Sequence, residues 1–262
     1  MHRLFLIILL LCTPPIVASD TDDLSRVVER GTLRVLAFPH QETVFMRRMP
    51  ELGAEGLHRF NGIDYEIMAA WATELGVELE ILPLTTAYSD LIPGLLRGDG
   101  DVAATAMSIT PARQEVVTFS RPYFQVFETV VTRRDRDVRN RADLEGLRLA
   151  VVPGTSFEET VRKLGLHSNV VEKSFFLEMY TAVAEGEADA TLSDSISVSR
   201  VLAKYPDLER RLKIAFTLPD ADQFGYAMRP GSTLKPHLDA FLDRLEASGK
   251  LDDIKASYLS SK

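Results

Sequence analysis

The alternation of strand-like and helix-like segments is the sequence feature that most constrains the fold of this chain. Strands are predicted over residues 32–38, 77–82 and 101–106, where apolar or alternating side chains predominate. The helices between them end at Gly76 and Gly98. Because parallel strands need a crossover between them, this order predicts an α/β unit whose sheet is mostly parallel and flanked by helices.

The same pattern starts again in the second half of the chain. Residues 147–152 read as a strand and a helix follows them. Later, a helix stop at Gly186 and a strand led by Asp189 repeat the earlier order of Gly98 and Asp101. We interpret both aspartates as the exposed starts of strands. The repetition predicts a second α/β lobe.

Two β-rich stretches, residues 127–132 and 224–229, join the two halves. The charged run over residues 133–141 is typical of a solvated linker. A terminal helix over residues 234–258 is expected to pack back on the first lobe. We therefore predict a two-strand hinge between lobe 1, residues 20–128 plus 225–262, and lobe 2, residues 129–224.

The N-terminus has the pattern of an export signal. Arg3 precedes an unbroken apolar run, residues 4–11, that is too short to span a bilayer. Small residues at 17–19 suit cleavage, so we predict a signal peptide over residues 1–19 and a periplasmic mature chain. Lipid attachment at Cys12 is the less favoured alternative, because the preceding residue is not small. Cys12 is the only cysteine, so the mature chain would have no disulfide.

Charge and motif spacing exclude several classes of function. With 30 Lys and Arg against 38 Asp and Glu, the net charge is -8, which makes nucleic acid a poor partner. The five histidines show no metal-ligand spacing, and neither a nucleophile elbow nor a phosphate-loop lysine occurs. We expect no metal, no cofactor and no enzyme activity, since no catalytic domain follows before Lys262.

Candidate binding residues follow the last strand of the first lobe. Open α/β sheets bind ligands at the carboxyl ends of their strands, so two facing lobes would share one cleft. Thr110 and Pro111 predict a helix start that places Arg113 in the first turn. The Arg113 guanidinium and the Ser108 hydroxyl could then hold a carboxylate. A surface arginine without a role is the alternative.

The second lobe offers matching candidates. Thr155 to Glu158 fits a capping box, which explains Thr155 by itself, although Thr155 or Ser156 could also donate to a ligand carboxylate. Asp194 ends a predicted strand and would face the cleft; the alternative is a turn residue that bonds its own backbone. An anionic Asp194 opposite a cationic Arg113 would suit a zwitterion.

Several short motifs occur in order along nearly all of the mature chain. They are Gly62-Ile63-Asp64-Tyr65-Glu66-Ile67, Leu91-Ile92-Pro93-Gly94-Leu95, Ser108-Ile109-Thr110-Pro111-Ala112-Arg113, Phe119-Ser120-Arg121-Pro122-Tyr123, Gly154-Thr155 and Asp189 to Asp194. Together they resemble bacterial extracellular solute-binding proteins of family 3, the periplasmic amino-acid-binding proteins. The first motif is also similar to the binding-protein-like domain of membrane-bound lytic transglycosylases.

The resemblance implies a type II periplasmic-binding-protein fold that closes on an amino-acid-like ligand. It implies these ligand contacts: Arg113 and Ser108 for the carboxylate, Thr155 and Ser156 as donors from the other lobe, Asp194 for the ammonium group, Thr105 in the cleft wall and Tyr88 stacked on the ligand. Phe38 is the remaining candidate. Phe38 begins a segment, residues 38–45, that departs from the family pattern and is followed by an insertion over residues 46–60. The resemblance therefore does not imply which ligand side chain is preferred.

The expected function is delivery of a small amino acid or related carboxylate to an ABC permease in the inner membrane by a monomeric binding protein. A sensor or regulatory module that uses the same closed state is an alternative, because both would bind ligand in the same way. A periplasmic dehydratase built on this scaffold is a third.

Overall fold

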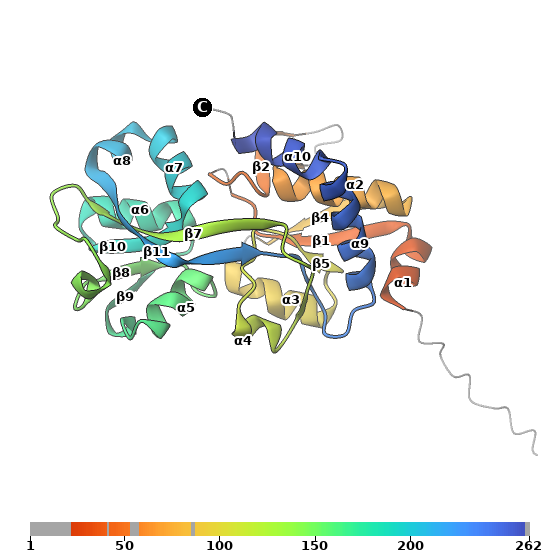
Figure 1. Ribbon diagram of the computed structural model, residues 1–262, viewed down its shortest axis with the longest axis horizontal. Coiled ribbons are helices and arrows are strands. Elements are labelled where there is room, and N and C mark those ends of the chain that lie inside the picture. Colours follow the sequence, from red (N-terminus) through yellow and green to blue (C-terminus); the bar gives the residue numbers. More distant parts are fainter. Residues whose placement is uncertain (1–21, 41, 53–57, 85–86, 260–262) are drawn as a thin grey trace, which may run out of the picture.

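The computed structural model describes residues 22–40, 42–52, 58–84 and 87–259, so the predicted signal peptide lies outside the described residues. Two lobes lie side by side, and two long strands run between them (Figure 1). Each lobe is built on one five-stranded sheet. The structure therefore confirms the predicted two-lobed α/β architecture.

Lobe 1 contains the sheet of strand order β4-β1-β5-β12-β6. Its strands are β1 Thr32–Ala37, β4 Glu78–Pro83, β5 Val102–Ala103, β6 Thr118–Phe119 and β12 Ala227–Met228. A separate hairpin is formed by β2 Arg47–Leu52 and β3 His58–Asn61. Its helices are α1 Asp23–Arg30, α2 Ile63–Leu75, η2 Tyr88–Asp90, α3 Leu91–Arg97, α4 Pro111–Gln114, α9 Leu234–Ala247 and α10 Lys250–Leu259.

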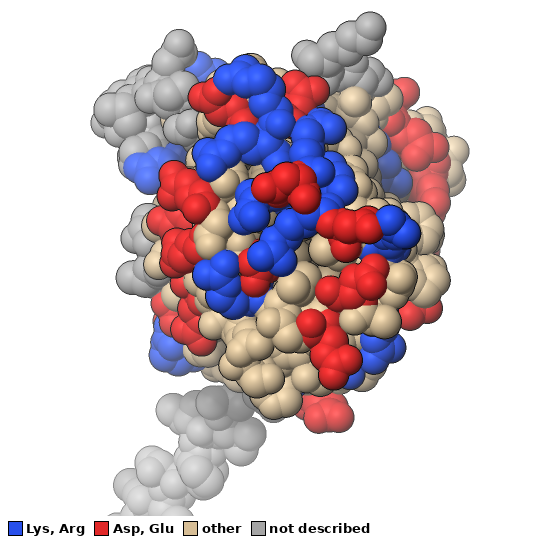
Figure 2. Space-filling model, turned by 90° about the vertical axis from the view of Figure 1, so that its left-hand side faces the viewer, with Lys and Arg blue, Asp and Glu red and all other residues tan. Residues whose placement is uncertain are grey.

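Lobe 2 contains the sheet of strand order β11-β7-β10-β8-β9. Its strands are β7 Phe124–Arg133, β8 Leu149–Val151, β9 Val170–Glu172, β10 Ala190–Asp194 and β11 Leu212–Phe224. Its helices are η3 Arg141–Leu144, α5 Ser156–Lys163, η4 His167–Asn169, α6 Phe176–Glu185, α7 Ser195–Lys204 and α8 Pro206–Arg211. On the outer end of this lobe, Lys and Arg side chains gather in one patch (Figure 2).

Both sheets are mixed. Strand β1 pairs in parallel with β4 and β5, and β8 pairs in parallel with β9 and β10, as the strand–helix–strand order predicts. The antiparallel pairs involve β7, β11 and β12, the strands that carry the chain between the lobes and back. The second crossing, β11, begins before the predicted stretch of residues 224–229. The exact residue boundaries of the lobes stay a prediction.

Glycines end the helices where the sequence analysis expected them. Gly76, Gly98 and Gly186 all take left-handed backbone angles after a helix, a conformation that costs glycine little, and Gly31 does the same after α1. Gly249 does the same at φ 75° and divides the predicted terminal helix into α9 and α10. None of the helices in the described ranges is long and apolar enough to cross a membrane.

The two strand-leading aspartates require a correction. Asp101 and Asp189 were expected at exposed strand starts, but only 8% and 5% of their surfaces are exposed. Both carboxylates are covered because arginine side chains pair with them.

The core has two parts. One packs α2, α9 and α10 against the lobe 1 sheet around Trp71 and Phe241. The other fills lobe 2 and continues into lobe 1 through Phe38 and Tyr88. Because this second cluster crosses between the lobes, apolar contact as well as the two long strands holds them together.

Candidate functional site

A cavity lies between the lobes. Lobe 1 contributes His40, Glu42, Thr43, Phe45, Tyr88, Thr105, Ala106 and Ser108 to its lining. Lobe 2 and the end of β11 contribute Thr155, Ser156, Phe157, Phe176, Tyr180, Ser193, Asp194, Ser197, Val201 and Phe224. A molecule in this cavity would therefore touch both lobes at once.

Six of the eight residues predicted to bind ligand line this cavity. They are Tyr88, Thr105, Ser108, Thr155, Ser156 and Asp194. The other two, Phe38 and Arg113, are buried next to the cavity and do not line it. The geometry of each shows what it contacts instead.

Asp194 satisfies both interpretations of its position. It ends β10 and caps α7, where its Oδ1 atom accepts hydrogen bonds from the N–H groups of Ile196 at 3.1 Å and Ser197 at 2.8 Å. It also lines the cavity and is 7% exposed. Burial raises the pKa of its carboxyl group, although the capping bonds oppose that shift.

Two serine hydroxyls meet across the gap between the lobes. The Oγ atoms of Ser108 and Ser156 are 3.0 Å apart, and Ser108 Oγ lies 2.6 Å from Asp222 Oδ2. Burial raises the pKa of the Asp222 carboxyl group, although the Ser108 hydrogen bond and Arg113 oppose that shift. When Asp222 is ionised, the single hydroxyl hydrogen of Ser108 goes to Asp222 and Ser156 donates to Ser108. Asp222 was not predicted. It follows Ser108 by 114 residues, and its own segment carries no motif.

The two threonines of the predicted set bond to the backbone. Thr155 caps α5 and donates to the Val152 carbonyl at 2.7 Å, while Glu158 accepts from the Gly154 N–H at 2.8 Å. The predicted capping box is thus shifted, since Glu158 reaches Gly154 and not the N–H of Thr155. Thr105 donates to the Phe38 carbonyl at 3.2 Å.

Arg113 ties the two lobes together. The predicted helix start is confirmed, because Thr110 caps α4 and Pro111 occupies its first position. The guanidinium is buried, with Nη1 donating to the Ser108 carbonyl and Nη2 to the Gly154 carbonyl, each at 2.9 Å. It also lies 6.0 Å from the centre of the Tyr88 ring, within range of a cation–π contact. Arg113 therefore links the two lobes, and it also lines a second pocket between them together with Tyr88 and Thr155.

Aromatic rings from both lobes form a contiguous cluster beside the cavity. Phe38 stacks on Phe175 with centroids 5.9 Å apart and meets Tyr88 edge-on at 5.8 Å. His40 lies 4.9 Å from Phe176. Phe38 is 1% exposed, so it supports Tyr88 and Phe176 from behind.

Glu42 closes the edge of the cavity and was missed in the sequence. Its Oε1 accepts a hydrogen bond from the Tyr205 hydroxyl at 2.6 Å and from Lys204 at 3.4 Å, and His40 lies 3.6 Å from Oε2. Burial opposes ionisation, but nearby His40, the Tyr205 hydrogen bond and Lys204 bring the pKa of Glu42 down to about 2. The only signal was indirect, because Glu42 lies in the segment that departs from the family pattern.

Asp64 is buried behind the cavity wall and bonds to the backbone of Ala106, which lines the cavity. This buried residue of the first family motif accepts hydrogen bonds from the Tyr123 hydroxyl, the Tyr226 hydroxyl and the Ala106 N–H. Burial raises its pKa to about 6. Ala106 lines the cavity with φ 52°, a left-handed conformation that is unusual for a residue with a Cβ. The hydrogen bond that the Ala106 N–H donates to Asp64 holds this backbone conformation in place.

Residues 49–261 match the family model of bacterial extracellular solute-binding proteins, family 3. The chain belongs to this family. The resemblance seen in the motifs is thereby confirmed. Among curated relatives, this solute-binding protein is 31% identical over 246 residues to membrane-bound lytic murein transglycosylase F of Aliivibrio fischeri. That match includes 90% of this chain and 47% of the relative, so the chain spans about half the length of the curated relatives it matches.

Solved structures of binding proteins share the whole fold. A mutant of ArgBP from T. maritima superposes with a TM-score of 0.79 at 30% identity, covering 91% of this solute-binding protein and all of that chain. An ancestral arginine-binding protein bound to arginine gives a TM-score of 0.76 at 26% identity, covering 87% and 98% of the two chains. These matches confirm the type II periplasmic-binding-protein fold.

Proposed function

We propose that this solute-binding protein captures a small amino compound, such as an amino acid, in the cavity between its lobes and delivers it to an ABC permease. The periplasmic location and the monomeric state are part of the proposal. The observation that carries it is Asp194, a buried carboxylate that faces a cavity lined from both lobes. A ligand ammonium group would neutralise it, and the same ligand would stabilise contact between the lobes.

Six predicted residues are proposed as ligand contacts: Tyr88, Thr105, Ser108, Thr155, Ser156 and Asp194. Tyr88 offers an aromatic face, and Asp194 offers charge. Arg113 is proposed to act indirectly, since its terminal nitrogens hold carbonyl groups of both lobes. Relatives whose titles name bound arginine or glutamine support an amino-acid-like ligand.

Thermal denaturation with each of the L-amino acids tests the proposal. A ligand at about 100 times its Kd adds about 2.7 kcal/mol to the free energy of unfolding, which raises the Tm. Asp194→Asn is the matched variant, because asparagine caps helices as well as aspartate does. We expect it to keep the Tm of the free protein and to lose most of the ligand-induced shift. A panel without any shift, or an undiminished shift in the variant, contradicts the proposal.

A second function is favoured by one observation. The curated relatives are named murein transglycosylases and are about twice as long as the matched region, so this fold also occurs as one part of a cell-wall enzyme. The chain would then act as a ligand-sensing module at murein. Co-sedimentation with purified murein sacculi tests this, with binding in the pellet supporting it and protein left in the supernatant contradicting it.

A further inference from the structure

The outer end of lobe 2 carries a basic patch, although the protein as a whole is acidic. The patch consists of residues 133–141, which begin at the last residue of β7, and residues 207–213, which lead into β11. These two segments contain eight Lys and Arg against four Asp and Glu, whereas the whole chain has a net charge of -8. Figure 2 shows Lys and Arg side chains spread across this face of the molecule.

The backbone holds the two segments of the basic patch side by side. Arg133 of β7 pairs with Leu212 of β11, and the Arg134 N–H donates to the Arg211 carbonyl at 2.8 Å. Because β7 and β11 are the two strands that run between the lobes, the patch lies where both have their outer ends. It is therefore a fixed feature of the fold.

Three cations of the basic patch keep their full charge. The Arg134 guanidinium donates to the Glu209 carbonyl at 2.9 Å, and the Lys213 ammonium donates to the Arg136 carbonyl at 2.6 Å. Arg211 likewise donates to a backbone carbonyl. A carbonyl group orients a cation without neutralising it, so these groups contribute a positive field at the surface.

The apolar side chains of the two segments are turned inward. Val138, Leu208 and Leu212 pack against the core of lobe 2, and neither segment contains an aromatic residue. Protein–protein interfaces are usually anchored by apolar and aromatic side chains at their centre, and this surface offers none of them. A partner is therefore held by charge alone, through cations spread over a wide face.

We propose that the basic patch binds the surface of an anionic phospholipid bilayer, independently of the ligand cavity. A bilayer presents many phosphate groups in one plane, which matches cations spread over one face of a lobe. The cavity lies at the inner end of β11, where Phe224 lines it, so a bilayer at the outer end leaves it uncovered. The solute-binding protein is thus held at the membrane with or without ligand.

Co-sedimentation with lipid vesicles tests this proposal. The protein used is the predicted mature chain, residues 20–262, because the apolar run over residues 4–11 would bind lipid by itself. At about 50 mM NaCl we expect vesicles with about 30% phosphatidylglycerol to bind at least about tenfold more protein than vesicles of phosphatidylcholine alone. About 500 mM NaCl should release it, because salt screens exposed charges. Equal binding to the two kinds of vesicle, or binding to neither, overturns the proposal.

Neutralising the basic patch supplies the second measurement. Each cation near an anionic bilayer strengthens binding about fivefold, so the triple variant Arg134→Gln, Arg141→Gln and Arg211→Gln should reduce the partition coefficient about 100-fold. The single variant Arg141→Gln removes an exposed side chain and should reduce it about fivefold. Unchanged partitioning of the triple variant overturns the proposal.

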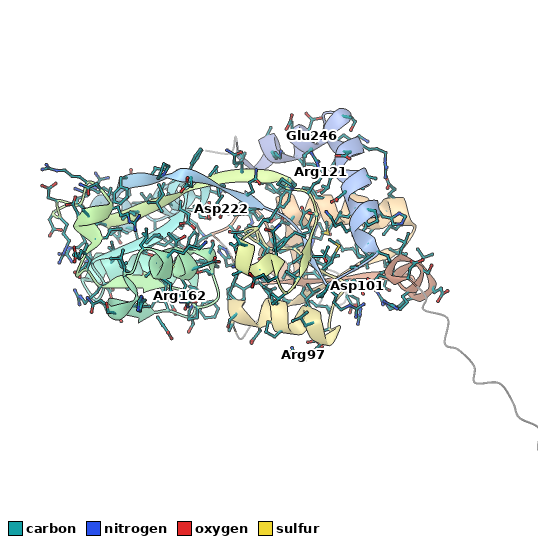
Figure 3. All side chains as sticks on the ribbon, turned by 60° about the horizontal axis from the view of Figure 1, so that its bottom comes forward. Arg97, Asp101, Arg121, Arg162, Asp222 and Glu246 are labelled. Carbon is teal, nitrogen blue, oxygen red and sulfur yellow. The ribbon has the colours of Figure 1, made fainter. Side chains whose placement is uncertain are left out.

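The matched control removes the same number of charges from lobe 1. Arg97→Gln, Arg244→Gln and Lys250→Gln lie in α3, α9 and α10, and Figure 3 labels Arg97 far from the patch. This triple variant should lose no more than about twofold in partitioning. A loss as large as that of the patch variant would show that net charge, and not the patch, governs binding, which overturns the proposal.

The thermal shift with ligand separates this proposal from the proposed function. The patch variant should keep the full ligand-induced rise in Tm, because none of its three substitutions lies in the cavity. If no ligand shifts the Tm of any variant but anionic vesicles still bind through the patch, the proposed function fails and the bilayer proposal stands. If the patch variant loses binding to murein sacculi and the parent protein binds no vesicles, the patch serves the cell wall and the bilayer proposal fails.

Discussion

The two lobes are alike far from the cavity and different next to it. In lobe 1, Asp101 accepts the N–H of Arg34 at 2.8 Å and pairs with the side chains of Arg34 and Arg30 (Figure 3 labels Asp101). The Arg34 guanidinium also donates to the Gly98 carbonyl at 3.1 Å. One carboxylate thus joins the start of the strand, the neighbouring strand and the end of the preceding helix.

Lobe 2 repeats this arrangement contact by contact. Asp189 accepts the N–H of Arg148 at 2.9 Å, and the side chains of Arg148 and Arg136 pair with it. The Arg148 guanidinium donates to the Gly186 carbonyl at 2.8 Å. The sequence pattern shared by the two lobes therefore corresponds to the same set of aspartate–arginine contacts in each. These contacts, the support of each lobe, join a strand to the helix before it and do not involve the cavity.

The residues that face the cavity do not make matching contacts in the two lobes. Lobe 1 holds its wall through Asp64, which fixes Ala106 from beneath. Lobe 2 presents Asp194, which caps its own helix and faces the cavity itself. The comparison indicates that the support is shared whereas the binding surface is particular to each lobe.

The largest expected loss of stability comes from removing Asp64, whose hydrogen bonds to the cavity wall have no counterpart in lobe 2. Asp64→Ala leaves two tyrosine hydroxyls and the Ala106 N–H without an acceptor, so we expect a loss of about 4 kcal/mol in the free energy of unfolding. Chemical denaturation measures it. The control Asp253→Ala, at an exposed site in α10, should change little. A loss below about 1 kcal/mol would mean that Asp64 is not the organiser of this wall.

The strand that joins the lobes should respond to pH in the sense opposite to the lobe supports. Arg148 lowers the pKa of Asp189, so stability from Asp189 is lost as the pH falls through that lowered value. Burial raises the pKa of Glu128 on β7 to about 7, so stability from protonated Glu128 is present below its unfolded pKa and is lost as the pH rises through about 7.

Glu128→Gln removes the free-energy cost of ionising a buried carboxyl group above about pH 7. At pH 8 we expect the variant to be more stable by up to about 3 kcal/mol, and the gain should vanish below about pH 4.5. Denaturation curves across this pH range measure the difference. Glu29→Gln, at an exposed site in α1, is the control. A gain that does not depend on pH would exclude ionisation of Glu128 as its cause.

The repeated supports can be compared directly. Asp101→Ala and Asp189→Ala each remove an acceptor from a backbone N–H and from two arginines, so we expect similar losses of about 2 kcal/mol. Urea denaturation of the two variants measures both losses. Costs that differ by more than about 1 kcal/mol would show that the two supports are alike in geometry but not in energy.

Local sequence was sufficient to predict the features that depend on neighbouring residues. Helix ends at Gly76 and Gly98, the cap at Thr110 and the edge position of Asp194 all follow from backbone preferences within a few residues. The partner of Glu42 could not be predicted, because Tyr205 is 163 residues away and meets it only when the lobes come together.

The direction in which a side chain points could not be predicted from the sequence either. Phe38 and Arg113 were both predicted to contact the ligand; Phe38 packs against other rings, whereas Arg113 lines a second pocket between the lobes that also includes Tyr88 and Thr155. Whether a ring or guanidinium faces a cavity depends on competing contacts, here Phe175 for the ring and two carbonyl groups for the arginine. Such competition is decided by tertiary packing and leaves no mark in local spacing.

The smallest expected effect isolates the contact between the lobes. Gly154 has φ 81°, and a Cβ there would lie 2.7 Å from the Cα of Ser89 in the opposite lobe. Gly165 has φ 75° with open space around it. Gly154→Ala and Gly165→Ala should therefore share a backbone strain of about 1 kcal/mol, but only the first keeps the lobes from meeting.

For this pair we expect similar losses in the free energy of unfolding and different ligand binding. Gly154→Ala should weaken ligand affinity about tenfold, about 1.4 kcal/mol, because closure must push two backbones apart, whereas Gly165→Ala should bind normally. Calorimetry with the best ligand of the thermal screen measures both affinities. Equal binding by the two variants would show that the lobes need not meet at Gly154 when ligand is held, and the arrangement of Arg113 between them would then serve stability alone.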